Sequence, residues 1–246
     1  MGFFSWLFGK EKKTVPPPFP SAWENELIAR VHFYRHLETA QRRQFRERMM
    51  EFLATTTITG VKTEITDEDR MLLAAGAIIP IFAFPEWKYH NLREILVYPE
   101  HFDEDFTIGS HKKAILGMVG EGFMNDQMII SKKALHHGFS NDTDKRNTAI
   151  HEFIHLMDKS DGTVDGLPVH FIHKTEALPW IDLMEKNIRK IKADRSDIDD
   201  YGATNPGEFL AVAGEYFFER PALLQKKHPE LFERLQTIFN RPFPEK

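Results

Sequence analysis

The sequence NTAIHEFIHLMD, residues Asn147–Asp158, contains a His-Glu-x-x-His motif. Its apolar periodicity predicts a helix, and residues four apart lie on one face of a helix. His151 and His155 would therefore present their imidazoles to a single metal ion, with Glu152 beside them. The pattern is typical of a zinc site that activates water for hydrolysis.

The same residues at the same offsets also occur by chance on solvated helices, so the surroundings of the motif matter. Apolar side chains surround it, namely Ile150, Phe153, Ile154 and Met157. Because His and Glu are costly in a core unless they are compensated, we favour a metal site over a chance match. A catalytic zinc site keeps one position open for water, whose pKa falls to about 7, and Glu152 would take the proton.

Composition limits the classes of protein to consider. The 246 residues include 41% hydrophobic residues, enough for a substantial core, and the formal net charge of -5 does not favour nucleic-acid binding. The chain has no cysteine, so histidine and carboxylate side chains must hold any metal. No run suits a bilayer span and the first residues lack the order of a signal peptide. We therefore expect a cytoplasmic protein without stable membrane insertion.

The pattern along the chain predicts a short tail followed by one mostly helical domain. Residues 1–20 combine an aromatic cluster with a proline-rich run, and we interpret them as a tail and linker packed on the domain. The alternative is a membrane-surface peptide, since aromatics beside lysines suit an interface. Residues 21–246 are expected to form a single domain with a helical N-terminal part and helices at about 40–54 and 176–193.

Strand-like runs in the first and middle parts of the chain predict a small sheet of three or four strands. These runs are residues 56–61, 94–98 and 128–131. The glycines between the last two runs follow no phosphate-binding spacing, and we interpret Gly117, Gly120 and Gly122 as a flexible loop. A small sheet among many helices gives an α+β fold class.

A third metal ligand has to come from elsewhere in the chain. No histidine follows the motif at the short distance used when that ligand is histidine, so glutamate is left. Asn205 and Pro206 are typical of an N-cap and a first helical residue. In the helix that they open, Glu208 and Glu215 lie seven apart on one face, flanked by apolar residues. Spacing alone leaves both candidates open.

The stretch after the motif, Asp158–Pro168, is rich in acids and glycines. It lacks the order and the closing glutamate of an EF-hand, so we expect a structural loop rather than a calcium site. Asp158 has an alternative role. Because it lies three residues after His155, it is placed to accept a hydrogen bond from that imidazole and orient it.

These motifs together resemble the Mlc titration factor A family of bacterial zinc peptidases, whose catalytic domain is similar to that of anthrax lethal factor. The resemblance runs from about Phe19 to Phe239 and is strongest from Ile150 to Phe218. It implies a zincin-like (gluzincin) metallopeptidase fold in which a small mixed sheet lies over the active-site helix. It also implies that the edge strand of that sheet pairs with an extended peptide substrate.

The family pattern has a tyrosine seven residues before the ligand glutamate, as Tyr201 precedes Glu208 here. The resemblance therefore implies that His151, His155 and Glu208 bind one zinc ion, while Glu215 supports the site or its packing. It further implies that the hydroxyl of Tyr201 stabilises the oxyanion of a tetrahedral intermediate. The alternative is a core tyrosine whose hydroxyl has a structural partner.

The resemblance also implies aminopeptidase-like activity on short peptides and binding of the glucose-responsive transcriptional repressor Mlc. Two classes of function follow. One is a zinc peptidase in which Glu152 activates water, and the other is a non-catalytic protein that titrates the repressor and has a structural zinc site. The presence of Glu152 favours the enzyme, because a structural zinc site fills its fourth position with another ligand and needs no general base.

Overall fold

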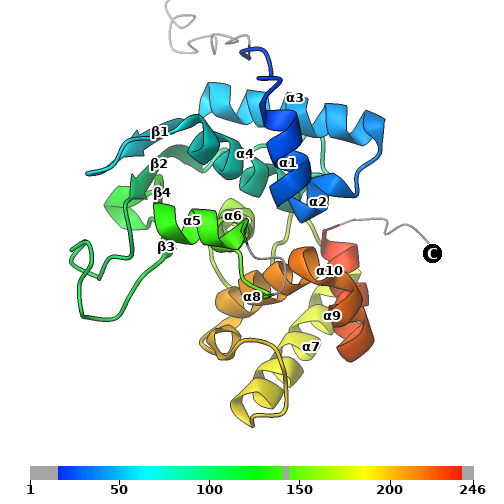
Figure 1. The fold of residues 1–246 in the computed structure, drawn as a ribbon. Helices are drawn as coiled ribbons and strands as arrows, with labels where there is room; N and C mark the ends of the chain where they lie inside the picture. The colour runs from blue at the N-terminus through cyan, green and yellow to red at the C-terminus, as the bar shows by residue number, and fades with distance from the viewer. Residues whose placement is uncertain (1–15, 141–143, 240–246) are drawn as a thin grey trace, which may run out of the picture.

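A computed structural model describes residues 16–140 and 144–239 (Figure 1). The α-helices are α1 (Trp23–Arg30), α2 (His32–Arg35), α3 (Thr39–Thr55), α4 (Asp67–Ile81), α5 (Lys132–Gly138), α6 (Thr148–Asp158), α7 (Lys174–Lys192), α8 (Pro206–Glu219), α9 (Pro221–Lys227) and α10 (Pro229–Ile238). The 3-10 helices are η1 (Gly122–Met124), η2 (Lys159–Asp161) and η3 (Asp200–Ala203). The strands are β1 (Thr57–Gly60), β2 (Leu92–Tyr98), β3 (Gly117–Val119) and β4 (Asp126–Ser131).

The strands form one sheet in the order β1-β2-β4-β3. The first three run parallel, while β3 pairs antiparallel with β4 at one edge, so the sheet is mixed. Side chains alternate between its faces, with Ile95 and Ile130 in the main core and Ile129 packed with Phe102 in a smaller cluster on the other face. Many helices around this small mixed sheet confirm the α+β class and the predicted strands.

The interpretation of Gly117 as part of a flexible loop is wrong, because Gly117 begins β3. Met118 lies opposite Ile129 of β4, and the strand ends at Val119. Only the segment after the strand, including Gly120, connects β3 to β4. Glycine has a low preference for strands, so a three-residue strand that begins with glycine gives no local signal.

The motif helix α6 lies in the middle of the molecule, between the side formed by the sheet with α1–α4 and the side formed by α7–α10 (Figure 1). Glycines let its two neighbouring helices approach closely. A β-carbon on Gly76 of α4 would lie 2.8 Å from the β-carbon of Ala149, and one on Gly214 of α8 would overlap the side chain of Ile154. Because these contacts leave no free space, α6 is held tightly between α4 and α8.

The first described residues pack on the helices that follow them. Phe19 makes an edge-to-face contact with Trp23, with ring centroids 6.0 Å apart, and the guanidinium of Arg46 lies over its ring. The remainder of the predicted tail, residues 1–15, lies outside the described residues. The division into a tail and one domain stays a prediction. Within residues 16–140 and 144–239, no helix has both the length and the apolar character needed to cross a membrane.

Candidate metal centre

The first two site residues are placed by α6. Asn147 is its N-cap, and the Oδ1 atom of this residue accepts a hydrogen bond from the N–H of Ile150. One helical turn separates His151 from His155, so both imidazoles lie on one face and their Nε2 atoms are 3.1 Å apart. Both side chains are largely buried. The sequence prediction that the two rings face one point is therefore consistent with the structure.

The third site residue comes from α8. Asn205 is the N-cap of this helix and Pro206 its first residue, as predicted, and Oδ1 of Asn205 accepts the N–H of Glu208 at 2.9 Å. The Oε2 atom of Glu208 lies 3.0 Å from Nε2 of His151 and 3.3 Å from Nε2 of His155. Among the described residues these three side chains form a group able to hold a metal ion.

The distances suit zinc. Tetrahedral ligands at 2.0–2.1 Å from zinc lie about 3.3 Å from one another, close to the separations of the three atoms here. Burial alone would lower the pKa of His151, but the carboxylates of Glu215 and Glu208 raise it well above its usual range. Burial would also raise the pKa of Glu208, and the contacts with His151 and His155 outweigh it and lower that pKa. Both shifts reflect the mutual attraction of the imidazoles and the carboxylates in this buried cluster.

Glu215 contacts the other side of the same imidazole. Its Oε1 atom lies 2.6 Å from Nδ1 of His151, and its Oε2 atom accepts the N–H of Asn147 at 2.5 Å. Because Nδ1 and Nε2 point in different directions, Glu215 lies behind His151 while Glu208 shares the Nε2 side with His155. The geometry thus distinguishes the two glutamates that spacing left open.

Glu152 is buried beside these residues, and burial raises its pKa above the usual range for a glutamate. Strand β3 crosses directly in front of it. A β-carbon on Gly117 would lie 2.7 Å from the carboxyl carbon of Glu152, so any larger residue there would have to displace the Glu152 side chain. No local pattern predicts this contact, because the glycines at this point of the chain indicate a loop.

Tyr201 lies in η3, with its side chain 48% exposed. Its hydroxyl donates a hydrogen bond to Oε1 of Glu208 at 3.1 Å, and its ring lies 5.9 Å from that of His151. Partial burial and then the charge of Glu208 raise the pKa of Tyr201 to about 12, so the hydroxyl keeps its proton at neutral pH. Its exposure places Tyr201 outside the core, although its hydroxyl does have a partner in Glu208, as the structural alternative supposes.

Asp158 does not orient His155. Its Oδ2 atom accepts the N–H of Gly166 at 2.8 Å, while its Oδ1 and the Nδ1 of His155 have no hydrogen-bond partner among the described residues. Burial raises the pKa of Asp158 to about 7. Asp161 and Asp165 accept hydrogen bonds from main-chain N–H groups within their own loop, as expected of a structural loop.

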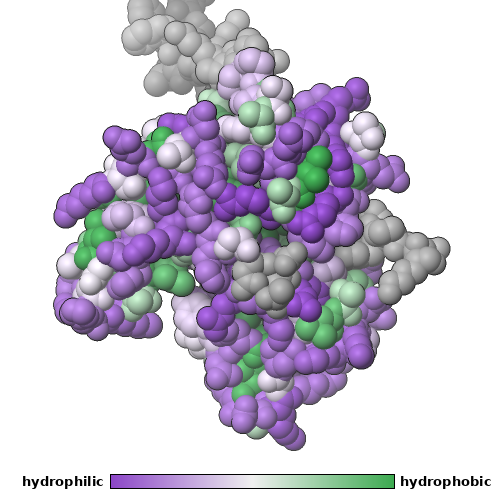
Figure 2. Space-filling view, in the orientation of Figure 1, coloured by the Kyte–Doolittle hydropathy of each residue, from purple (hydrophilic) through white to green (hydrophobic). Residues whose placement is uncertain are grey.

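A cleft of about 580 Å³ opens in front of the candidate ligands. Residues 113–119 form one wall, and Tyr201, Asn205 and Val212 contribute to the other. The outline of the molecule is indented between these two sides in Figure 2, where hydrophilic residues predominate over the visible face.

Among the described residues, no strand pairs with the outer edge of β3, which runs along this cleft. The C=O of Leu116 and the N–H of Gly120 bond to β4. Because the direction of the main-chain groups alternates along an antiparallel strand, those of Gly117 and Val119 point away from β4. The free edge therefore offers hydrogen-bonding groups to a ligand in the cleft.

Comparison with known proteins finds a family and relatives that match most of the chain. The model of the family described as glucose-regulated metallo-peptidase M90 matches residues 7–240. An uncharacterized protein of Synechocystis sp. is 28% identical over 251 residues, covering 97% of this chain and 90% of that protein. Mlc titration factor A of Pectobacterium atrosepticum is 25% identical over 189 residues, which cover 72% of this chain and 70% of that protein. Mlc titration factor A of Klebsiella pneumoniae is 23% identical over 254 residues, which cover 97% of this chain and 92% of that protein.

Proposed function

Because this chain belongs to the glucose-regulated metallo-peptidase M90 family, we propose that it is a zinc-dependent peptidase. One observation carries the proposal. The Nε2 atoms of His151 and His155 and the Oε2 atom of Glu208 converge on one point beside the buried carboxylate of Glu152. The zincin-like (gluzincin) assignment of the fold is part of the same proposal.

His151, His155 and Glu208 would hold the metal through these three atoms. When bound, zinc supplies Lewis-acid chemistry, polarising a peptide carbonyl and making water more acidic. Glu215 accepts the Nδ1 proton of His151, which leaves the Nε2 lone pair free as the ligand. Glu208 is anionic because its pKa is lowered, so it contributes charge as well as an oxygen.

Glu152 acts as the general base. A carboxylate oxygen of this residue takes a proton from the attacking water and passes it to the leaving amine. Its raised pKa suits this cycle, because a carboxylate with a higher pKa holds the proton more readily between the two steps. Gly117 restricts where the carboxylate can lie.

Tyr201 stabilises the oxyanion that forms on the substrate. Its hydroxyl donates to Glu208 in the present structure, and its half-exposed side chain has room to turn toward the cleft. A donor aimed at developing charge lowers the barrier because the interaction strengthens as the charge forms.

The substrate is an extended peptide that pairs with the free edge of β3. Main-chain groups of Gly117 and Val119 would bond to the peptide backbone, a contact that does not depend on side-chain identity. The family resemblance supports short peptides and an aminopeptidase-like activity. A cytoplasmic location and the lack of nucleic-acid binding stay predictions.

The test uses the full chain with zinc quantitation and a panel of aminoacyl chromogenic substrates, each with a free and a blocked amino group. We expect about one zinc per chain and cleavage of the free-amino substrates only. Glu152→Gln should keep zinc and fold while turnover falls roughly 10²- to 10⁴-fold, the usual contribution of a general base. A zinc-replete native chain that cleaves none of the panel would contradict the proposal.

The names of the Mlc titration factor A relatives suggest a second candidate function, the capture of the repressor Mlc with a structural zinc site. Calorimetric titration of purified Mlc into the zinc-replete Glu152→Gln variant separates the two candidates. Binding that equals that of the native chain would show that capture does not require the base. A native chain that binds Mlc but has no peptidase activity would favour the second candidate.

A further inference from the structure

A chain of buried hydrogen bonds runs from His151 away from the cleft. It starts at Nδ1 of His151, 2.6 Å from Oε1 of Glu215. The other oxygen of Glu215 accepts the main-chain N–H of Asn147 at 2.5 Å. The side-chain Nδ2 of Asn147 then donates to the C=O of Gly138 at 3.0 Å and to Oε1 of Glu219 at 3.1 Å.

Asn147 is the residue in which these contacts meet. It is fully buried, and all of its side-chain hydrogen-bonding atoms are used, since Oδ1 also accepts the N–H of Ile150. Its backbone is extended, with φ −147° and ψ 96°. Its own N–H therefore lies outside the helical ladder and is free to donate to Glu215.

Asn147 packs closely against the end of α5. A β-carbon on Gly138, the last residue of α5, would lie 2.9 Å from Cγ of Asn147. Glu215 and Glu219 lie one turn apart on α8, and both are buried. Asn147 thus joins the end of α5, the start of α6 and the inner face of α8.

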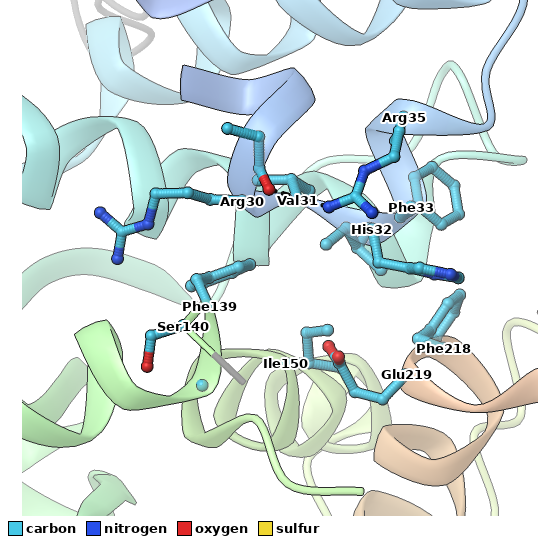
Figure 3. Close-up of a pocket in the computed structure, with 13 residues that line it drawn as sticks. Arg30, Val31, His32, Phe33, Arg35, Phe139, Ser140, Ile150, Phe218 and Glu219 are labelled. Carbon is cyan, nitrogen blue, oxygen red and sulfur yellow. Dashed lines mark hydrogen bonds between the residues drawn. The ribbon is translucent and has the colours of Figure 1, made fainter. Parts of the chain in front are cut away.

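The last residue of this series of hydrogen bonds, Glu219, lines a second cavity of about 100 Å³. In Figure 3 the carboxylate of Glu219 lies next to Ile150 and points toward the middle of that cavity. The cavity shares no lining residue with the cleft. His151 and Glu215 also line the cleft, whereas Gly138, Asn147 and Glu219 do not. The part of the hydrogen-bond chain beyond Glu215 therefore lies behind the metal-binding face.

We propose that Asn147 is a positioning residue for the metal site. Its side chain fixes the first turn of α6 against α5 and α8, which directs its N–H at Glu215. Glu215, held at one oxygen by Asn147, uses the other to fix the ring orientation and the tautomer of His151. The inference rests on the zinc site of the proposed function, but not on peptide hydrolysis.

The variant Asn147→Asp isolates the positioning role. Aspartate has nearly the same shape and keeps an oxygen that can cap α6 through Ile150. It replaces the Nδ2 donor by an acceptor that faces the C=O of Gly138 and the carboxylate of Glu219. Both hydrogen bonds from position 147 to these groups are therefore lost. Because groups that orient a ligand imidazole typically contribute 10- to 100-fold to metal affinity, we expect zinc to bind 10- to 100-fold more weakly.

Thr66→Ala is the matched control. Thr66 is the N-cap of α4, where its Oγ1 accepts the N–H of Asp69, and it lines neither cavity. Loss of this cap should lower the melting temperature and leave zinc affinity within twofold of the native value. Loss of a helix cap by itself should therefore not change the zinc affinity.

The zinc dissociation constant is measured by competition with a chromophoric chelator, and the melting temperature of the metal-free chain is measured alongside. In the double variant Asn147→Asp with Glu215→Gln, zinc affinity should fall by less than the sum of the losses in the two single variants. Both substitutions remove contacts of the same series of hydrogen bonds to His151. If Asn147→Asp does not fold, Asn147→Ser, which retains a capping oxygen, replaces it.

Zinc affinity within threefold of native in the aspartate or serine variant, or fully additive losses in the double variant, would overturn the proposal. Asn147 would then be only a helix cap. A native chain that binds zinc but cleaves no peptide would contradict the proposed function and leave this inference standing.

Discussion

Gly117 of β3 lies so close to Glu152 of α6 that a β-carbon at position 117 would be 2.7 Å from the carboxyl carbon of Glu152. The edge strand that lines the cleft is thus in contact with the proposed general base. Because β3 also carries the free main-chain groups, a peptide paired with its edge would lie beside the base. In the proposed function, one short strand would both receive the peptide and confine the carboxylate.

Gly117→Ala should therefore impair catalysis without removing the metal. The added methyl group displaces the carboxylate of Glu152 and leaves the three metal-binding atoms untouched. A misplacement of about 1 Å in a catalytic group costs roughly 10²-fold, so we expect turnover to fall about 100-fold at unchanged zinc content. Native turnover in this variant would show that β3 does not confine the base.

The two glutamates of α8 should respond differently to truncation. Glu208→Ala removes an atom that converges with both imidazoles, so we expect the larger loss of zinc after dialysis against a metal-free buffer. Glu215→Ala leaves all three ligands and removes the partner of Nδ1, so we expect zinc affinity to fall about 10- to 100-fold. A greater loss in Glu215→Ala than in Glu208→Ala would reverse the assignment of the third ligand.

Sequence patterns predicted the parts of the site that depend on local structure. The spacing of His151 and His155 defines a helical face, and Asn205 with Pro206 marks a helix start, because both signals lie within a few residues. The strands β1, β2 and β4 were also predicted, since β1 is rich in β-branched residues and the apolar residues of β2 and β4 are contiguous. In each case the information lies within one element.

The rest depends on how distant elements meet. Seven residues are about two helical turns, so Glu208 and Glu215 share one face of α8, and only the crossing of α6 over α8 directs them to different nitrogens of His151. The contact between Gly117 and Glu152 likewise follows from the pairing of β3 with β4. No pattern within one segment reports such contacts.

Asp197 makes the stability of the protein depend on pH. Burial would raise its pKa, but hydrogen bonds from Lys145, His228, Lys227 and Tyr216 outweigh burial and lower it. A carboxylate whose pKa is lower in the folded state contributes stability above its unfolded pKa of about 3.9, and that contribution is lost as the pH falls through the folded-state pKa. We therefore expect the free energy of unfolding to decrease below about pH 4.

Asp197→Asn should remove this part of the acid dependence. At pH 7 we expect the variant to lose about 2 kcal/mol, the scale of hydrogen bonds to a charged group, and below pH 4 the difference from native should shrink. Urea unfolding between pH 3 and pH 7 measures both. Asp194→Asn, an exposed position earlier in the same connection between α7 and η3, is the control and should follow the native curve.

Tyr201 and Tyr216 allow the catalytic and structural roles of a tyrosine hydroxyl to be compared in one protein. The hydroxyl of Tyr201 donates to Glu208 at the half-exposed wall of the cleft. The side chain of Tyr216 is buried, and its hydroxyl donates to Asp197 at 2.9 Å. Each tyrosine loses one hydrogen bond on substitution by phenylalanine.

Tyr201→Phe should lower kcat roughly 10- to 1000-fold with little change in KM, because the lost donor acts mainly on the developing oxyanion. Its melting temperature should barely change, since exposed substitutions usually stay within about 0.5 kcal/mol. Tyr216→Phe should show the opposite pattern. It leaves a partly buried carboxylate short of a donor, which costs about 1–3 kcal/mol, while the folded fraction keeps native turnover.

Turnover and melting temperature measured on the same preparations distinguish these outcomes. If Tyr201→Phe were destabilised but fully active, its hydroxyl would be structural like that of Tyr216, and the oxyanion would need another donor. The choice of Glu208 as third ligand would lose the support of the seven-residue spacing from Tyr201 and would rest on the position of its Oε2 atom beside the two imidazoles alone.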